Sequence, residues 1–157
     1  MKRLLPILLL LALLLPACAR KESAPSIDAV TDAVLNEIEG ADTLTLADED
    51  YAETNLSCED ELEECKIFLG ETREIGILRL DDDANAAMIE KSIKEYLQNE
   101  TSSITSLLAL YPSEVLEERL THYENATVIQ KGRYICYFAL PRAEAEKAKS
   151  AFSKALS

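Results

Sequence analysis

Apolar residues recur every three or four positions in four parts of the chain, and this spacing predicts amphipathic helices. The first helix follows Ser26, a good N-cap residue, and ends at Gly40; the last is opened by Pro141, a residue suited to a helix start. The four predicted stripes are Ile27, Val30, Val34 and Ile38; Ala86, Ile89, Ile93, Tyr96 and Leu97; Val115, Leu116 and Leu120; and Ala145, Ala148, Phe152 and Leu156.

The long second helix has two further signals. The DDD run at 81–83 predicts its cap, and Glu90–Lys94 and Lys91–Glu95 are opposite-charge pairs four residues apart. We expect a pause near Asn99, a continuation through ITSLLALY and an end at Pro112. A short helical turn is also predicted at 48–53 within the polar stretch 41–64.

Elsewhere the apolar runs are short and the spacing changes, which predicts two β-hairpins. KIFLG (66–70) and EIGILRL (74–80) flank the turn 71–73, whereas NATVIQ and RYICYFAL flank Lys131-Gly132. Gly132 suits a turn position with positive φ. Because 74–80 has apolar residues on both faces, it is expected inside the sheet. The order α, ββ, αα, ββ, α predicts an α+β domain with a mostly antiparallel sheet of about four strands and helices packed on it.

The first residues differ from all of this. Lys2 and Arg3 precede fourteen almost purely apolar residues, 4–17. As a helix they span about 21 Å, and they are fewer than the about 20 residues that a membrane-spanning helix needs. The sequence Leu15-Pro16-Ala17-Cys18 resembles the lipobox of bacterial lipoproteins. That resemblance implies cleavage before Cys18 and a diacylglyceryl lipid on its thiol. Ordinary secretion with cleavage after Ala19, and an uncut leucine helix that acts as an anchor, remain open.

These features predict three segments: a signal peptide at 1–17, the lipidated Cys18 with a tether at 18–26, and one domain at 27–157. Removal of the signal peptide leaves 14 basic against 29 acidic residues. Such a strongly acidic chain disfavours nucleic acid, which needs a basic surface, and anionic lipid also repels it. We therefore expect attachment to the extracytoplasmic face of the cell membrane through the lipid on Cys18.

The stretches REIGILRLDDDANAAMIEKSIKEYL, LYPSEV and HYENATVIQKGRYICYF resemble the DUF4358 domain of small bacterial lipoproteins. The resemblance covers about residues 28–155. It implies a cell-envelope location in a bacterium, and members of that family come mostly from Gram-positive anaerobes. No activity is established for that family, so the resemblance implies no mechanism, cofactor or protein partner.

Cysteine and histidine are the first candidates for chemistry. An oxidising compartment favours a Cys58–Cys65 disulfide; a Cys65–Cys136 bridge and buried free thiols remain open. Zinc binding by these cysteines with His122 is disfavoured, since C-x6-C is wider than usual zinc spacing. His122, at the predicted end of the third helix, has no recognisable catalytic partners in the sequence.

Acidic and aromatic groups are the remaining candidates. The runs DED (48–50), EDELEE (59–64) and DDD (81–83) lack the spacing of a calcium loop and predict solvated charge. Five aromatic residues are candidates for a ligand groove, although core packing is the commoner role: Tyr111, Tyr123, Tyr134, Tyr137 and Phe138. We expect a non-enzymatic binding or envelope-associated domain without a cofactor or metal; the alternative is a small hydrolase or thiol redox enzyme that uses His122 or the cysteines.

Overall fold

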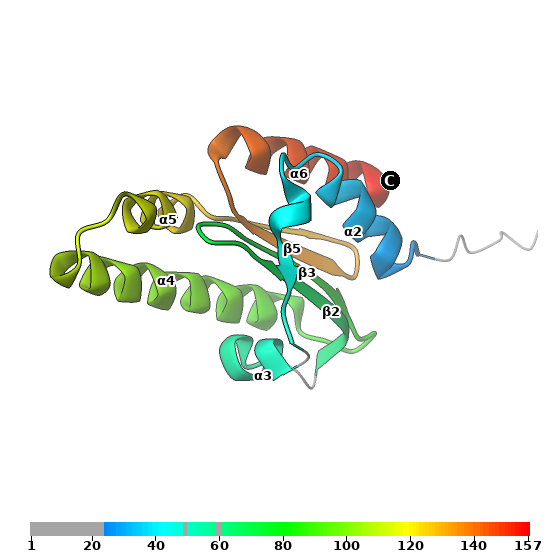
Figure 1. Ribbon diagram of the computed structural model, residues 1–157. Helices are drawn as coiled ribbons and strands as arrows, with labels where there is room; N and C mark the ends of the chain where they lie inside the picture. The colour runs from blue at the N-terminus through cyan, green and yellow to red at the C-terminus, as the bar shows by residue number, and fades with distance from the viewer. Residues whose placement is uncertain (1–23, 49, 59–60) are drawn as a thin grey trace, which may run out of the picture.

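The computed structural model describes residues 24–48, 50–58 and 61–157 (Figure 1). The predicted signal peptide, Cys18 and most of the tether lie outside these ranges, as do Glu49, Glu59 and Asp60 of the acidic runs. The α+β fold is confirmed.

The sheet has five strands within these ranges, rather than the four expected, and every pairing is antiparallel. The strand order is β1-β2-β3-β5-β4, with bounds β1 Thr45–Leu46, β2 Leu62–Leu69, β3 Glu74–Leu80, β4 Thr127–Lys131 and β5 Tyr134–Ala139. The missed strand, β1, is two exposed residues that pair with the end of β2. A strand so short has no alternation that a sequence pattern could reveal.

Both predicted hairpins are present. β2 pairs with β3 from Leu69↔Glu74 outward, and β4 pairs with β5 from Lys131↔Tyr134 outward. Gly132 in the second turn has φ 59°, as expected for a tight turn between twisted strands. β3 lies between β2 and β5, which confirms that it is an internal strand.

Helices cover both faces of the sheet (Figure 1). α2 (Ile27–Leu35) and α6 (Arg142–Ala155) pack together on one face, and α3 (Asp50–Leu56), α4 (Ala86–Leu110) and α5 (Glu114–Glu124) lie on the other. Successive β3 residues therefore contribute to two separate clusters. Ile75 and Ile77 pack under α2 and α6, whereas Leu78 and Leu80 pack under α4.

Four predicted details of the helices are wrong. α2 ends at Leu35 rather than near Gly40, although Ile38 is still buried in the turn that follows. α4 is capped by the side chain of Asn85, which accepts from Met88 N at 3.2 Å, and not by the DDD run. α4 also continues through Asn99 without a pause. Val115, expected to face inward, is 40% exposed because no strand lies beneath this end of α5.

Candidate functional site

Cys58, Cys65 and Cys136 lie in buried or half-buried positions and are not bonded to one another in this structure. Burial raises the pKa of Cys58 to about 11 and of Cys65 to about 12, and it raises the pKa of Cys136 strongly as well. Cys65 and Cys136 belong to the two opposite clusters, on strands separated by β3, so the alternative Cys65–Cys136 bridge is excluded. Cys58 and Cys65 share one cluster, and their pairing stays a prediction.

His122 lies in the last turn of α5, as predicted, but its contacts are structural. The ring is 6% exposed, and Nδ1 lies 2.8 Å from the Thr72 carbonyl, a geometry in which Nδ1–H donates. Thr72 also donates from its hydroxyl to Glu118 at 3.0 Å. His122 therefore holds α5 to the β2–β3 turn.

The aromatic residues considered for one groove are distributed over three places, so that hypothesis is wrong. Tyr134 and Phe138 are buried under α2 and α6, whereas Tyr137 and the α5 residue Tyr123 are buried in the cluster on the α4 side of the sheet. Tyr111 is 68% exposed at the end of α4. Alternate residues of β5 point to opposite faces, which separates Tyr134 and Phe138 from Tyr137.

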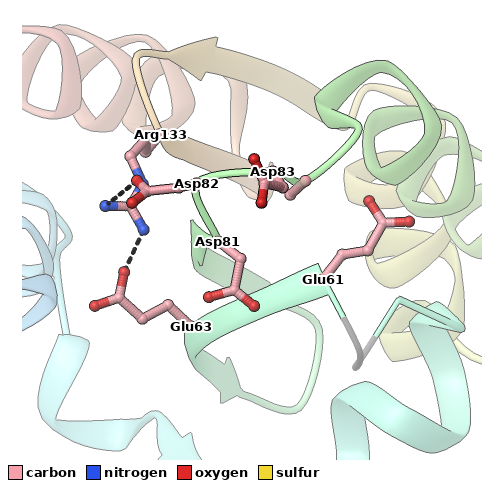
Figure 2. A pocket seen from close by; sticks show the side chains of 7 residues that line it. Glu61, Glu63, Asp81, Asp82, Asp83 and Arg133 are labelled. Atoms are coloured by element: carbon pink, nitrogen blue, oxygen red, sulfur yellow. Dashed lines mark hydrogen bonds and ion pairs between the residues drawn. The ribbon is translucent and has the colours of Figure 1, made fainter.

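Two of the acidic runs meet at an open hollow of about 670 Å³ (Figure 2). It is lined by Glu61, Glu63, Asp81, Asp82, Asp83, Ala84 and Arg133. Arg133 forms ion pairs with Asp82, at 3.0 Å, and with Glu63, and it also donates to the Leu80 carbonyl at 2.9 Å. Glu61, across the hollow from Arg133, accepts from the backbone N–H of Asn85 at 2.7 Å.

These contacts give several of the acidic side chains a structural role. The Arg133–Glu63 pair joins the β4–β5 turn to β2, and Glu61 joins the start of β2 to the start of α4. In the part of the chain that the structure describes, no three histidine, cysteine or acidic side chains converge on a point suited to a metal ion. What the hollow offers is excess negative charge at an open surface, which suits a cationic group.

The most unusual polar group is one that the sequence analysis missed. Glu74, the first residue of β3, is 0% exposed, and three tyrosine hydroxyls donate to its carboxylate. Tyr96 of α4 lies 2.8 Å from Oε2, Tyr123 of α5 lies 2.5 Å from Oε2, and Tyr137 of β5 lies 2.6 Å from Oε1. We call these four residues the Glu74 cluster. They join one strand to two helices and to the neighbouring strand.

The cluster reaches the surface through one further hydroxyl. Tyr51 of α3, which is half-buried, lies 2.8 Å from the Tyr96 hydroxyl. On the α5 side, the Arg119 guanidinium lies 5.3 Å from the centroid of the Tyr123 ring and pairs with Glu100 at 3.1 Å. Among the described residues, the Glu74 carboxylate thus has hydroxyl donors and no directly bonded cation.

Gly76 makes room for one of these donors. A Cβ on Gly76 would lie 2.0 Å from Cε1 of the Tyr137 ring, its neighbour across the β3–β5 ladder. The tyrosine ring therefore occupies the space above Gly76, and its hydroxyl reaches Glu74 two residues earlier on the same face of β3. Glycine at position 76 and tyrosine at position 137 act as one structural unit.

The balance of burial and hydrogen bonds leaves Glu74 with a raised pKa. Burial is the largest cause and favours the neutral acid, and the three tyrosine hydrogen bonds oppose it by stabilising the carboxylate. The same burial, together with the negative carboxylate, raises the pKa of Tyr96, Tyr123 and Tyr137. These tyrosines are hydrogen-bond donors at neutral pH.

Chemically, the Glu74 cluster can hold or release one proton inside the domain, but it cannot touch a substrate because its carboxylate is sealed from solvent. Its arrangement is that of an internal polar bridge between the sheet and the α4–α5 layer. The sequence has one relevant signal: a glutamate opens an internal strand in which Arg79 is the one other charged residue. Nothing in the pattern shows that three distant tyrosines converge on it.

No family model matches the chain, and no curated protein or solved structure was found to resemble it. The helices of the described ranges include none that is both long enough and apolar enough to span a bilayer.

Proposed function

We propose that the chain is a lipid-anchored extracytoplasmic domain that acts by binding at the cell envelope, with the diacylglyceryl group on Cys18. The observation on which this rests is the LLPAC stretch, which precedes a compact domain after only a short tether. The resemblance to the DUF4358 lipoproteins is part of the same proposal.

The start of the fold limits how far the domain extends from its anchor. The Tyr134 hydroxyl donates to the Pro25 carbonyl at 2.5 Å, and the Ser26 side chain accepts from Ala29 N at 3.2 Å. These contacts hold the chain from Pro25 onward. The seven steps from Cys18 to Pro25 span at most about 25 Å, so a lipid on Cys18 would keep the domain beside the bilayer.

A binding role is favoured over thiol or histidine chemistry by the surroundings of those groups. A nucleophilic cysteine needs a lowered pKa, whereas burial raises the pKa of Cys58 and Cys65 to about 11 and about 12. His122 donates to a backbone carbonyl and is nearly fully buried. Because helices cover both sheet faces, the surfaces left for binding are helices, loops and the edges of the sheet.

The anchor is tested with a Cys18→Ser variant in cells given a fatty-acid analogue for labelling. The wild-type chain is expected to take up the label and sediment with membranes, whereas Cys18→Ser loses the label and is released or kept as an uncut precursor. Cys65→Ser is the matched control and retains both properties. Mass spectrometry that finds the wild-type chain starting at an unmodified Arg20 would refute the lipid anchor.

A further inference from the structure

Helix α4 is longer than the sheet on which it packs. Its 25 residues span about 37 Å, whereas the seven residues of β3 span about 23 Å. The buried residues of α4 end at Ile104, and the last turns extend past the strands with α5 beside them (Figure 1). The final part of α4 therefore has no sheet to cover it.

Apolar residues nevertheless continue into that part. Leu107, Leu110 and Tyr111 are 46%, 71% and 68% exposed, and Val115 at the start of α5 is 40% exposed. We call these four residues the apolar tip. Leu107 and Leu110 stand three positions apart on one face of α4, and Tyr111 follows as the C-cap residue, its backbone N–H donating to the Leu107 carbonyl. Clustered exposed apolar side chains of this kind mark an interaction surface.

The charged side chains nearest to the apolar tip in the sequence are negative, and the first basic residue beyond them, Arg119, pairs with Glu100 at 3.1 Å. Residues 101–118 contain three glutamates and no lysine or arginine. Glu114 and Glu117 occupy the first turn of α5, and the last turn of α4 has no basic residue to balance the partial negative charge of its carbonyl end. A partner must therefore combine apolar side chains with positive charge.

This chemistry disfavours the two simplest occupants. A second copy would bring glutamates against glutamates, and the tip is small beside the about 1,200 Å² that a stable dimer buries. An anionic lipid surface is repelled for the same reason. The tip also lies at the opposite end of the domain from the first described residues, which lead to the tether (Figure 1).

We propose that the apolar tip is a docking site for a protein segment whose apolar face is flanked by lysine or arginine, such as a basic amphipathic helix. The proposal rests on the binding role given above and names the class of partner. Leu110 and Tyr111 would be the apolar contacts, and Glu114 and Glu117 would set the charge preference.

The test uses the purified processed chain in neutral detergent, with or without lipid on Cys18, and a labelled leucine–lysine amphipathic peptide. Fluorescence anisotropy should show saturable binding that weakens at least about tenfold in the Leu110→Ser/Tyr111→Ser variant. The matched control, Leu46→Ser/Met88→Ser, removes two other exposed apolar side chains at unchanged charge and should bind like the wild type. Glu114→Gln/Glu117→Gln should bind more weakly and with less dependence on salt.

Equal losses in the tip and control variants would overturn the proposal, as would equal binding of a leucine–glutamate peptide. A dimer in sedimentation that the tip variant abolishes would assign the surface to a second copy, and tip-dependent binding to vesicles would assign it to lipid. The positions changed in the tip and control variants, Leu110, Tyr111, Leu46 and Met88, are all exposed. Both variants should therefore keep the wild-type melting temperature, which verifies that they fold. If the purified chain carries no lipid, the proposed anchor is refuted. The peptide-binding result still tests the apolar tip, because the assay does not depend on the lipid.

Discussion

The face of the sheet under α2 and α6 is filled almost entirely by hydrocarbon and aromatic groups, whereas the face under α4 and α5 includes a buried carboxylate and its three hydroxyl donors. The two faces share the same strands. Along β3, Ile75 and Ile77 project to the first face and Glu74 and Gly76 lie on the second.

The difference shows two ways in which one sheet positions its helices. Apolar packing under α2 and α6 is non-directional, and its strength follows from the area removed from water. The hydrogen bonds of the Glu74 cluster are directional and costly to leave unmade, so they fix where α4 and α5 lie. The layer that presents the apolar tip is thus the one held by a specific polar bridge.

The largest loss of stability is expected on the sheet face under α2 and α6. Phe152 of α6 is 0% exposed, and Phe152→Ala should lower the free energy of unfolding by about 3–5 kcal/mol through the cavity it leaves. Urea unfolding measures the loss, which should be the same at acid and neutral pH because no carboxylate takes part. A loss below about 1 kcal/mol would show that α6 does not pack as described.

An intermediate loss of stability is expected from Gly76→Ala. The new Cβ would lie 2.0 Å from the Tyr137 ring, so the ring must move and its hydroxyl leaves Glu74. The expected loss is about 2–3 kcal/mol in urea unfolding. The control is Gly132→Ala, where nothing lies within 4 Å of the new Cβ and only the positive φ contributes, about 1 kcal/mol. If the loss at Gly76 is as large in a Tyr137→Leu background, the two residues do not act as a unit.

The smallest effect concerns pH. Since the folded-state pKa of Glu74 is raised above its ordinary value of 4.5, the folded chain binds more protons than the unfolded chain in the interval between the two values. The stability that Glu74 contributes is therefore complete below pH 4.5 and declines as pH rises through the folded-state pKa.

Glu74→Gln cannot titrate, so the difference in unfolding free energy, wild type minus variant, should fall as pH rises across that interval and then level off. Urea titrations at a series of pH values give this difference, and the other carboxylates cancel from it. Ile75→Val, on the opposite face of β3, is the control and should leave the pH dependence of the wild type unchanged. A difference that rises with pH would mean that the tyrosine hydrogen bonds outweigh burial.

Local chemistry in the sequence determined the elements and their order. The two hairpins, the internal position of β3 and the inner face of α6 followed from residue spacing, and Ser26, Gly132 and Pro141 marked boundaries through their own backbone or capping preferences. Where local preference was weak, prediction failed: two-residue β1 has no pattern, and the cap at Asn85 competed with three preceding aspartates.

Only the tertiary structure decided which distant groups meet. Glu74, Tyr96, Tyr123 and Tyr137 are separated by as many as 63 positions, and their approach depends on sheet order, on helix packing and on the space left by Gly76. Likewise, Val115 was predicted to lie on the inner face of its helix, and its exposure follows from where the sheet ends. Spacing along a chain fixes which face a side chain occupies, but only packing determines what lies opposite that face.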